Sequence, residues 1–325
     1  MLDLHPEQVR GALSSACRAP SLLNSQPWAF MLGADHIELH LDTRRLLRSA
    51  DPERRQALIA CGAALFNLRL ALVDLGVRVD ERIWPDGPDG PLARVSGGAP
   101  ARPRHRLLEL ARAIPHRRSN PRPFLAVPVP IAFQQVLLQA AAGEGATLHL
   151  VTEPHSLVSL RTWTVDARRR DRADPERVSE RVRWAEAGRS PKPTAADLRA
   201  DGHRWTPTTD EVPRSVDGDD PPDGANEQPL IAVLTTVTDT PGGQVAAGLA
   251  LERTLLSATA LGLSMSTLPE LVEFAPARDR IRCMLGTGDF PQALVRLGFD
   301  GPVRPSGRRP VEDCLITGPL TAADR

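Results

Sequence analysis

Two long runs of almost continuously apolar residues are the clearest pattern in this chain. The first lies within the predicted helix Asp51–Gly76, and the second extends from about Val245 to Gly262. In each run apolar residues occupy most faces of a 3.6-residue helix, which is typical of a helix that is buried on all sides. Asp51-Pro52-Glu53 has the composition of a helix start, and a glycine follows the last apolar residue of each run. The pattern predicts two buried helices at the centre of the fold.

The two runs align with each other at a shift of 186 residues, and both terminal glycines then coincide. Apolar helices are alike in composition, so chance similarity is the alternative to an internal repeat. The matched glycines favour a repeat, and we expect the two helices to pack together as those of two subunits would in a dimer. The identical positions are Ala60, Gly62, Ala64, Leu65, Leu70, Leu75 and Gly76, which match Ala246, Gly248, Ala250, Leu251, Leu256, Leu261 and Gly262.

Shorter periodic segments surround these helices. Trp28–Leu32 and Ile37–Leu41 predict the two strands of a hairpin, because the second strand alternates cleanly and a Gly-Ala-Asp turn joins them. Leu230–Leu234 is apolar throughout and predicts a buried strand. Further helices are expected over residues 5–18, 104–115, 131–143 and 155–185, a strand over 146–152, and a loop or linker over the Gly- and Pro-rich residues 85–105.

Residues from about 186 to 229 show neither period and are rich in Pro, Asp, Gly and Thr. An insert of this length is typical of a functional lid or of a disordered segment. We expect a lid, with Trp205 as its apolar contact, and disorder is the alternative.

Composition narrows the class of protein. The 325 residues are 41% hydrophobic and 25% charged, as in a soluble globular protein. Acidic and basic residues number 40 each, so no electrostatic argument favours nucleic acid or an anionic membrane. Lys192 is the single lysine and lies in a Pro-flanked loop, which excludes a P-loop and a Schiff-base enzyme. Arginine, which is abundant here, is well suited to binding phosphate.

The cysteines indicate a reducing compartment and give no sign of a metal. Cys17, Cys61, Cys283 and Cys314 form no C-x-x-C pair, and no histidine lies at metal-ligand spacing. The first residues lack the pattern of a signal peptide, and no run of 18 apolar residues predicts a membrane span. We therefore expect a cytoplasmic protein with free thiols and no metal.

The segment Ala19–Phe30 carries the most specific motif, with the sequence A-P-S-L-L-N-S-Q-P-W-A-F. It places a turn and two amide side chains directly before a hydrophobic strand. Amides both donate and accept hydrogen bonds, as the edge of a planar heterocycle requires. The pattern A-P-S-x-x-N-x-Q-P-W-x-F resembles the signature of the FMN-dependent nitroreductases.

Three further segments are similar to motifs of that family. Arg117–Phe124 resembles its phosphate-binding R-R-S-x-R-x-F, with one extra residue before the last arginine, and Arg308-Arg309 resembles its second basic pair. Pro269–Leu271 resembles the turn that lies against the flavin ring; taken alone, such a Pro-Glu pair indicates only a turn or helix start. The resemblance implies cofactor contacts from Pro20, Ser21, Leu22, Asn24, Gln26, Arg117, Arg118, Ser119, Arg122, Pro269, Glu270, Leu271, Arg308 and Arg309.

The distribution of these motifs implies one site in a fused chain. The P-S-x-x-N motif occurs only in the first half, and the Arg-rich and Pro-Glu motifs only in the second. This resembles the Acg-type branch, whose chains are fused, internally duplicated and lid-covered. The implied fold is α+β and nitroreductase-like, with two related halves that mimic the usual homodimer and central long helices flanked by mainly antiparallel sheets. We expect the first half over residues 1–100 and the second over 101–325, with the lid at about 186–229.

The resemblance implies an FMN oxidoreductase. Hydride would pass from NAD(P)H to flavin N5 and on to an electron-poor acceptor such as a nitroarene or quinone. The flavin carries the chemistry, so no catalytic side chain is expected. The implied partners are one FMN, NAD(P)H and a small aromatic acceptor, with no nucleic acid and no membrane, in a monomer with internal pseudo-two-fold symmetry. The alternative is a protein that sequesters or stores FMN with little or no turnover.

Overall fold

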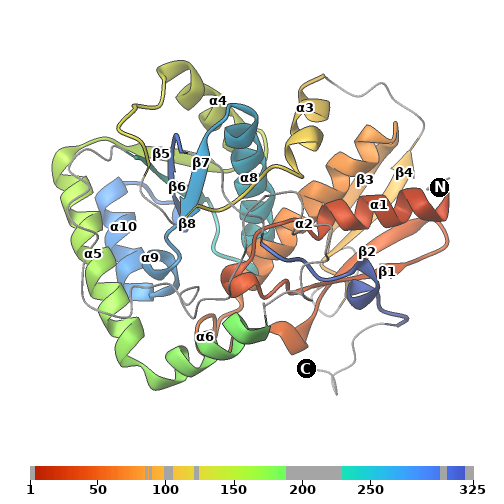
Figure 1. The fold of residues 1–325 in the computed structure, drawn as a ribbon, viewed down its shortest axis with the longest axis horizontal. Helices are drawn as coiled ribbons and strands as arrows, with labels where there is room; N and C mark the ends of the chain where they lie inside the picture. The colour runs from red at the N-terminus through yellow and green to blue at the C-terminus, as the bar shows by residue number, and fades with distance from the viewer. Residues whose placement is uncertain are drawn as a thin grey trace, which may run out of the picture.

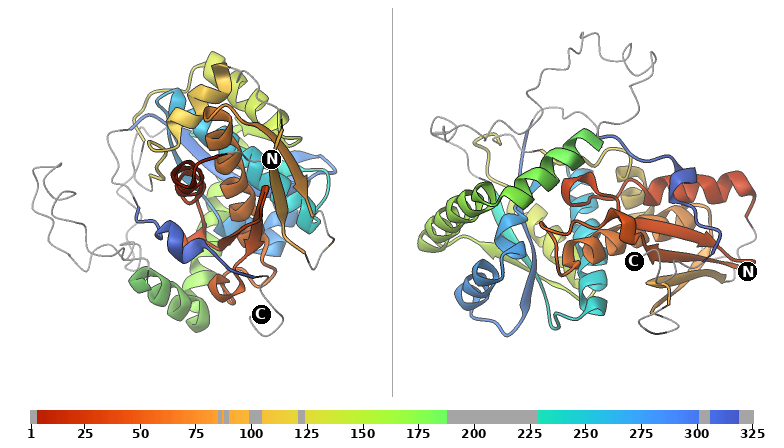
Figure 2. Two further views of the ribbon diagram at one scale, coloured as in Figure 1. Left: turned by 90° about the vertical axis from the view of Figure 1, so that its right-hand side faces the viewer. Right: turned by 90° about the horizontal axis from the view of Figure 1, so that it is seen from below.

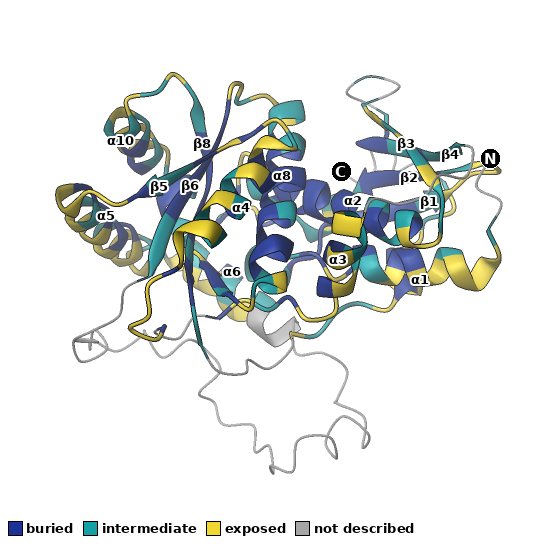
Figure 3. Ribbon diagram, turned by 90° about the horizontal axis from the view of Figure 1, so that it is seen from above, coloured by how far each residue is buried: buried dark blue, intermediate teal, exposed yellow. Residues whose placement is uncertain are grey.

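Two four-stranded antiparallel sheets flank a pair of long central helices (Figure 1). The computed structural model describes residues 4–84, 87, 90–98, 105–120, 124–187, 229–300 and 306–318. The central helices are α2, Arg55–Asp74, and α8, Pro241–Ala260. Their bounds differ by the same 186 residues that align their sequences. Both helices are almost entirely buried (Figure 3), as their apolar residues on all faces predict.

The two sheets share one topology. In each, the strands are ordered first, second, fourth, third along the sheet, and the long helix lies between the second and third strands in sequence. The α+β class and the two-half arrangement are thereby confirmed. The first sheet contains β1 Trp28–Leu32, β2 His36–Leu41, β3 Arg78–Ile83 and β4 Ala93–Gly98; the second contains β5 Thr147–Val151, β6 Leu230–Thr236, β7 Ser264–Thr267 and β8 Phe290–Gly298.

Shorter helices surround the two sheets and the central helix pair (Figure 1). Those predicted from periodicity are confirmed, except that the expected helix over 155–185 is two helices, separated at Asp174 before Pro175. The elements are α1 Pro6–Ala16, η1 Leu22–Asn24, η2 Thr43–Arg45, α3 His105–Ala113, α4 Ile131–Ala142, α5 Pro154–Ala173, α6 Pro175–Ala187, α9 Glu270–Glu273, α10 Ala275–Leu285 and η4 Val311–Cys314. Of the predicted lid at 186–229, residues 188–228, including Trp205, lie outside the described residues.

The expected loop over 85–105 is wrong, because β4 occupies residues 93–98 and lies between β2 and β3. Ala93 and Val95 are fully buried and alternate with the more exposed Arg94 and Ser96. This strand pattern is only four residues long and is surrounded by Gly and Pro. Pairing on both edges stabilises a strand whose local sequence gives little indication of it.

The predicted start of the first long helix is also wrong. The helix begins at Arg55 after Arg54, which has a left-handed backbone with φ 59°, rather than at Pro52. The Asp51 carboxylate nevertheless caps the helix, because it accepts hydrogen bonds from the N–H groups of Gln56 and Ala57 at 3.2 and 2.9 Å. Burial raises the pKa of Asp51 to about 6.

The central helices touch backbone to backbone at two equivalent glycines. A Cβ on Gly62 would meet the carbonyl oxygen of Val245, and one on Gly248 would meet the carbonyl oxygen of Ile59. The partners are themselves 186 residues apart, so the contact is reciprocal, as across a two-fold axis. Among the described residues α2 is the one helix long and apolar enough to cross a membrane. However, 78% of that stretch is buried inside the fold, so α2 is a core helix here.

One segment of the second half lies against the first sheet. Residues 306–318 return there, where the N–H of Ile316 donates to the carbonyl of Phe30 at 2.9 Å, and the blue helix η4 lies beside β1 (Figure 1 and Figure 2). Asn120, in the segment after α3, donates to the carbonyl of Met265 in β7 at 2.7 Å. Leu110 of α3 and Val311 of η4 belong to the apolar core around α2. The C-terminal segment therefore brings residues of the second half to the first.

We predict that Gly62→Ala and Gly248→Ala each lower the free energy of unfolding by at least about 1–3 kcal/mol, because the added methyl group overpacks against the backbone of the other helix. Urea denaturation measures the change. Gly11→Ala in α1 is the matched control, since no atom lies within 4 Å of its added Cβ. That control should gain up to about 1 kcal/mol from helix propensity. Equal stabilities for all three variants would contradict close helix packing.

Candidate functional site

A cavity of about 620 Å³ lies where the two halves meet. Its lining comes from η1, the N-terminal half of α2, the middle of α8, the second sheet, the segment after α3, and Ser306 and Arg308. This size is typical of a site for a small molecule or cofactor. The structure brings nine of the predicted contact residues into its lining: Pro20, Ser21, Leu22, Asn24, Arg117, Arg118, Ser119, Pro269 and Arg308.

One end of the cavity is strongly basic. Arg117 and Arg308 both donate through Nη2 to the carbonyl oxygen of Arg18, at 3.1 and 3.2 Å, so the two guanidinium groups converge on one atom. Arg18 and Arg118 also line the cavity. Arg117 is 3% exposed. Four cationic side chains from three separate segments therefore meet at this end.

One buried carboxylate partly compensates these charges. Glu252 of α8 is fully buried, and its Oε1 lies 3.5 Å from Nε of Arg117. Burial raises the pKa of Glu252, although Arg117 opposes the rise. Burial, together with the charge of Arg117, lowers the pKa of Arg308 to about 10, and burial with Arg18 and Arg117 also lowers the pKa of Arg118. One carboxylate thus stands against four guanidinium groups at the basic end of the cavity.

Two buried donor atoms at the basic end are placed to bind an anion. Nη1 of Arg117 and Nε of Arg308 have no hydrogen-bond partner among the described residues. A buried donor without a partner costs about 1–3 kcal/mol. A phosphate group would satisfy such donors with charge-assisted hydrogen bonds. The donor set of this structure therefore fits a phosphate-bearing ligand.

The signature segment holds Arg308 in place. Asn24 donates from Nδ2 to the carbonyl of Gly307 at 3.0 Å and accepts at Oδ1 from Nη1 of Arg308 at 3.4 Å. Leu23, Asn24 and Gln26 have φ between 49° and 52°, in the left-handed region that non-glycine residues rarely adopt. Such backbone strain is typical of functional sites, where contacts with the surrounding structure hold the backbone in an unfavourable conformation. Contact of Asn24 with a ring edge stays a prediction.

Four predicted contact residues lie behind the cavity wall rather than in its lining. Gln26 and Arg309 bind each other, since Oε1 of Gln26 accepts from the N–H of Arg309 at 2.9 Å and Nη1 of Arg309 donates to the carbonyl of Gln26 at 3.1 Å. Glu270 pairs with Arg168 at 2.8 Å. Leu271 is fully buried in an apolar cluster. Arg122, the remaining predicted residue, lies outside the described residues.

Another part of the cavity wall is apolar. Ile59, Ala60 and Ala63 of α2 form one side and Leu251 of α8 adjoins them, while Leu294 of β8 lies on the side of the second sheet. Small side chains at Ala60 and Ala63 leave a low surface on which a flat ring can pack. The arrangement of one basic and one apolar region suits an amphipathic ligand.

Helix α6 contributes to the cavity wall, a role that no motif in the sequence indicates. Arg181 of α6 is part of the lining. The neighbouring Glu180 is 3% exposed and accepts from the N–H groups of Arg48, Ser49 and Ala50 at 2.7, 3.1 and 2.8 Å. In Figure 1 this green helix crosses toward the first half. In sequence these residues form one Glu-Arg pair within a highly charged helix, so no local signal distinguishes them.

The fold and the cavity define a class: an α+β protein of two similar halves with a cavity between them that is basic at one end. The described residues contain no cluster of three or more His, Cys, Asp or Glu side chains placed to hold a metal ion.

Known proteins place the chain within this class. It is 32% identical over 316 residues to a Mycobacterium tuberculosis H37Rv protein provisionally named NAD(P)H nitroreductase Rv3131, with 93% of this chain and 89% of that protein covered. It is 28% identical over 315 residues to the same strain's provisionally named NAD(P)H nitroreductase acg, with 94% of each covered. The chain therefore belongs to the nitroreductase family, in its Acg branch.

Two other comparisons complete these findings. No protein-family model matches the chain. A nitroreductase with bound FMN from Desulfitobacterium hafniense superposes with a TM-score of 0.39 at 14% identity, over 63% of this chain and 95% of that one.

We predict that inorganic phosphate stabilises the protein purified without any bound ligand. At about ten times its Kd, phosphate should add about 1.4 kcal/mol, or about 3 °C in Tm. Arg308→Ala should abolish this shift because it removes one of the converging guanidinium groups. Arg82→Ala is the control, since Arg82 is an exposed residue of β3. A phosphate-induced shift of the same size in Arg308→Ala would refute the assignment of this end as the anion site.

Proposed function

We propose that the chain binds one FMN in this cavity and acts as an NAD(P)H-dependent oxidoreductase of nitroreductase type. The observation that carries the proposal is the convergence of Arg117 and Arg308 on the carbonyl of Arg18, in a cavity that also has an apolar wall; each has a donor atom without a partner in the described part of the chain. Membership of the nitroreductase family supports it. The names of the mycobacterial relatives support NAD(P)H as the reductant.

The residues of the chain suggest how FMN would be held. Arg117, Arg308, Arg118 and Ser119 would bind the phosphate, since they line one end of the cavity. The apolar side chains of α2, together with Pro269, would pack on the ring. Arg122 and the amide of Asn24 remain proposed contacts. Because these residues come from both halves, we propose that the two halves arose by internal duplication and that a monomer carries the complete site.

When bound, the flavin would accept hydride from a reduced nicotinamide and pass electrons to a nitroarene, quinone or similar acceptor. The contribution of the chain is binding, orientation and exclusion of water. Glu252 fixes Arg117 from behind, and Asn24 fixes Arg308. The Glu180 contacts hold α6 beside the cavity and limit access.

The closed position of α6 favours a second candidate function, which is sequestration of FMN with little turnover. Three charge-assisted hydrogen bonds to Glu180 would need to break before α6 could leave. The segment that we propose as a lid, at about residues 186–229, begins at the end of α6 in the sequence. Limited access would slow both the reductant and the acceptor.

One experiment separates the two functions. The protein is purified, its cofactor is extracted and identified, and NADPH is then added anaerobically to the holoprotein. Bleaching of the flavin absorbance, followed by recovery on adding a nitroarene or quinone, supports the oxidoreductase. A yellow protein that stays yellow with NADPH but bleaches with dithionite supports sequestration. Purified protein that neither contains nor binds FMN would refute both functions.

We predict that Arg117→Ala/Glu252→Gln weakens FMN binding by about 1.5–3 kcal/mol, the scale of hydrogen bonds to a charged group. The double variant removes the guanidinium without leaving a buried charged carboxylate behind. Titration of the apoprotein with FMN, followed by flavin fluorescence, measures the Kd. Glu252→Gln alone is the matched control and should lose much less affinity. Equal Kd values for the wild type and the double variant would exclude Arg117 from the site.

We also predict that Glu180→Ala increases the rate at which FMN dissociates by about 10-fold or more, because the closed position of α6 loses hydrogen bonds worth about 1.5–3 kcal/mol in total. Dilution into excess apoflavodoxin-type scavenger, followed by fluorescence, measures the rate. Glu176→Ala, which alters an exposed residue on the same helix, is the control. If both variants release FMN at the wild-type rate, α6 does not govern access.

A further inference from the structure

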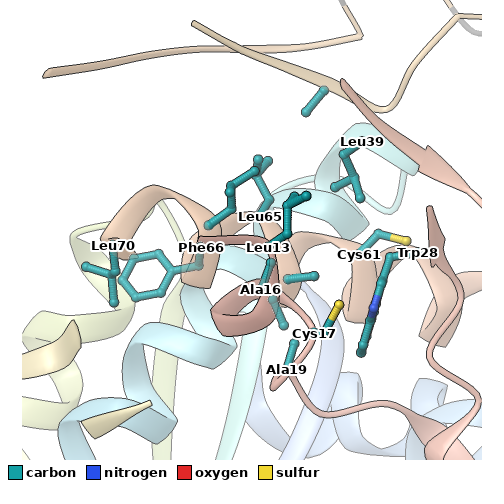
Figure 4. Packing of buried hydrophobic residues seen from close by; sticks show 14 of the residues in the cluster. Leu13, Ala16, Cys17, Ala19, Trp28, Leu39, Cys61, Leu65, Phe66 and Leu70 are labelled. Atoms are coloured by element: carbon teal, nitrogen blue, oxygen red, sulfur yellow. The ribbon is translucent and has the colours of Figure 1, made fainter. Parts of the chain in front are cut away.

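Two thiols from distant parts of the sequence meet in the core of the first half. Sγ of Cys17, at the end of α1, donates to Sγ of Cys314, in η4, at 3.6 Å. Cys17 is 2% exposed and Cys314 is fully buried. Both are free thiols in the structure. Figure 4 shows Cys17 between Ala19 and Trp28, at the edge of the apolar cluster.

The surroundings of the pair make its two thiols unequal. The hydrogen bond from Cys17 lowers the pKa of Cys314, and the nearby charges of Arg309 and Arg45 act in the same direction. The same hydrogen bond, together with burial, raises the pKa of Cys17. Of the two thiols, Cys314 therefore loses its proton more readily than Cys17. Thiolates are the nucleophilic form of cysteine.

The other two cysteines lack this arrangement. Cys61 is fully buried and donates to the carbonyl of Pro27 at 3.5 Å, and burial raises its pKa. Cys283 is an exposed residue of α10. They provide a buried and an exposed reference within the same chain.

The pair also lies between two of the three segments that build the basic end of the cavity. Cys17 directly precedes Arg18, whose carbonyl accepts from both Arg117 and Arg308. Cys314 lies in the segment 306–318, which carries Arg308 and Arg309. A bond between the two sulfur atoms would tie that segment to the end of α1.

We propose that Cys17 and Cys314 are a redox modification site, at which a hydroperoxide forms a reversible disulfide that fixes residues 306–318 against α1. The Cys314 thiolate attacks the peroxide, the O–O bond breaks, and Cys314 becomes a sulfenic acid as an alcohol or water leaves. The Cys17 thiol then attacks the Cys314 sulfur, the S–S bond forms, and water leaves. The dithiol loses two electrons and the hydroperoxide gains them. A dithiol reductant reverses the bond by exchange.

The test uses the full chain as Cys283→Ser, which removes the exposed thiol. The reduced protein is treated with hydrogen peroxide under native conditions, denatured, alkylated and analysed by mass spectrometry. The expected result is a mass loss of two hydrogens, a Cys17–Cys314 peptide pair that dithiothreitol removes, and a Cys61 that is still alkylated. Two alkylated thiols at 17 and 314, or a sulfinic acid at Cys314 with free Cys17, would overturn the proposal.

A variant and a second measurement test the sequence of steps and the consequence. Cys17→Ser should stop at the sulfenic acid of Cys314, which a dimedone-type probe traps; no trapped product would contradict Cys314 as the nucleophile. Hydrogen exchange of residues 306–318 should slow several-fold on oxidation, and an unchanged rate would overturn the proposed fixation. None of these readouts requires flavin, so the proposal and the proposed function stand or fail separately.

Discussion

The close approach of α2 and α8 is the constraint on which the rest of the structure depends. At Gly62 and Gly248 the two backbones touch without intervening side chains, and each glycine contacts the residue equivalent to the other's partner. This reciprocal contact fixes the spacing and relative orientation of the two sheets. It also places Ile59, Ala60 and Leu251 around one space, so the cavity is a direct result of how the two helices pack. A bulkier interface would separate the walls that a flat ligand needs.

Unlike the packing of the central helices, the basic end of the cavity destabilises the fold. Four arginines are brought together at a cost in desolvation and mutual repulsion, which the lowered pKa of Arg308 reflects. Glu252 offsets part of this cost from behind Arg117, and the strained signature segment holds Arg308 through Asn24. Among the described residues, buried donor atoms of Arg117 and Arg308 are left without partners, and they are already placed for the phosphate that we propose. The stability lost here is the source of the affinity proposed for a phosphate.

Much of this arrangement is predictable from the sequence, for reasons that are physical. The apolar faces of α2 and α8 and the alternation of β2 are local patterns, which can be recognised in the sequence without knowing the fold. The strand β4 is set by pairing with β2 and β3, and its own Gly-rich sequence suggests a loop. The motifs identified the residues near the cavity, but not which side of the backbone each side chain takes.

Side-chain direction accounts for the difference at the site. Gln26 and Arg309 bind each other, and Leu271 enters the core, although each is next to or near a residue that lines the cavity. The Glu180 contacts and the Cys17–Cys314 pair join residues more than a hundred positions apart, so no local spacing reveals them.

The return of residues 306–318 to the first sheet has a consequence for synthesis. Folding during translation proceeds from the N-terminal side, and the first sheet, α1 and the signature segment are made early. Arg308 is made only after both sheets. A nascent chain that has completed only its first half therefore has part of the cavity wall and lacks Arg308. The proposed anion site can form only after nearly the whole chain has been made. Binding of the proposed phosphate-bearing ligand would then require that the whole chain has been made and folded.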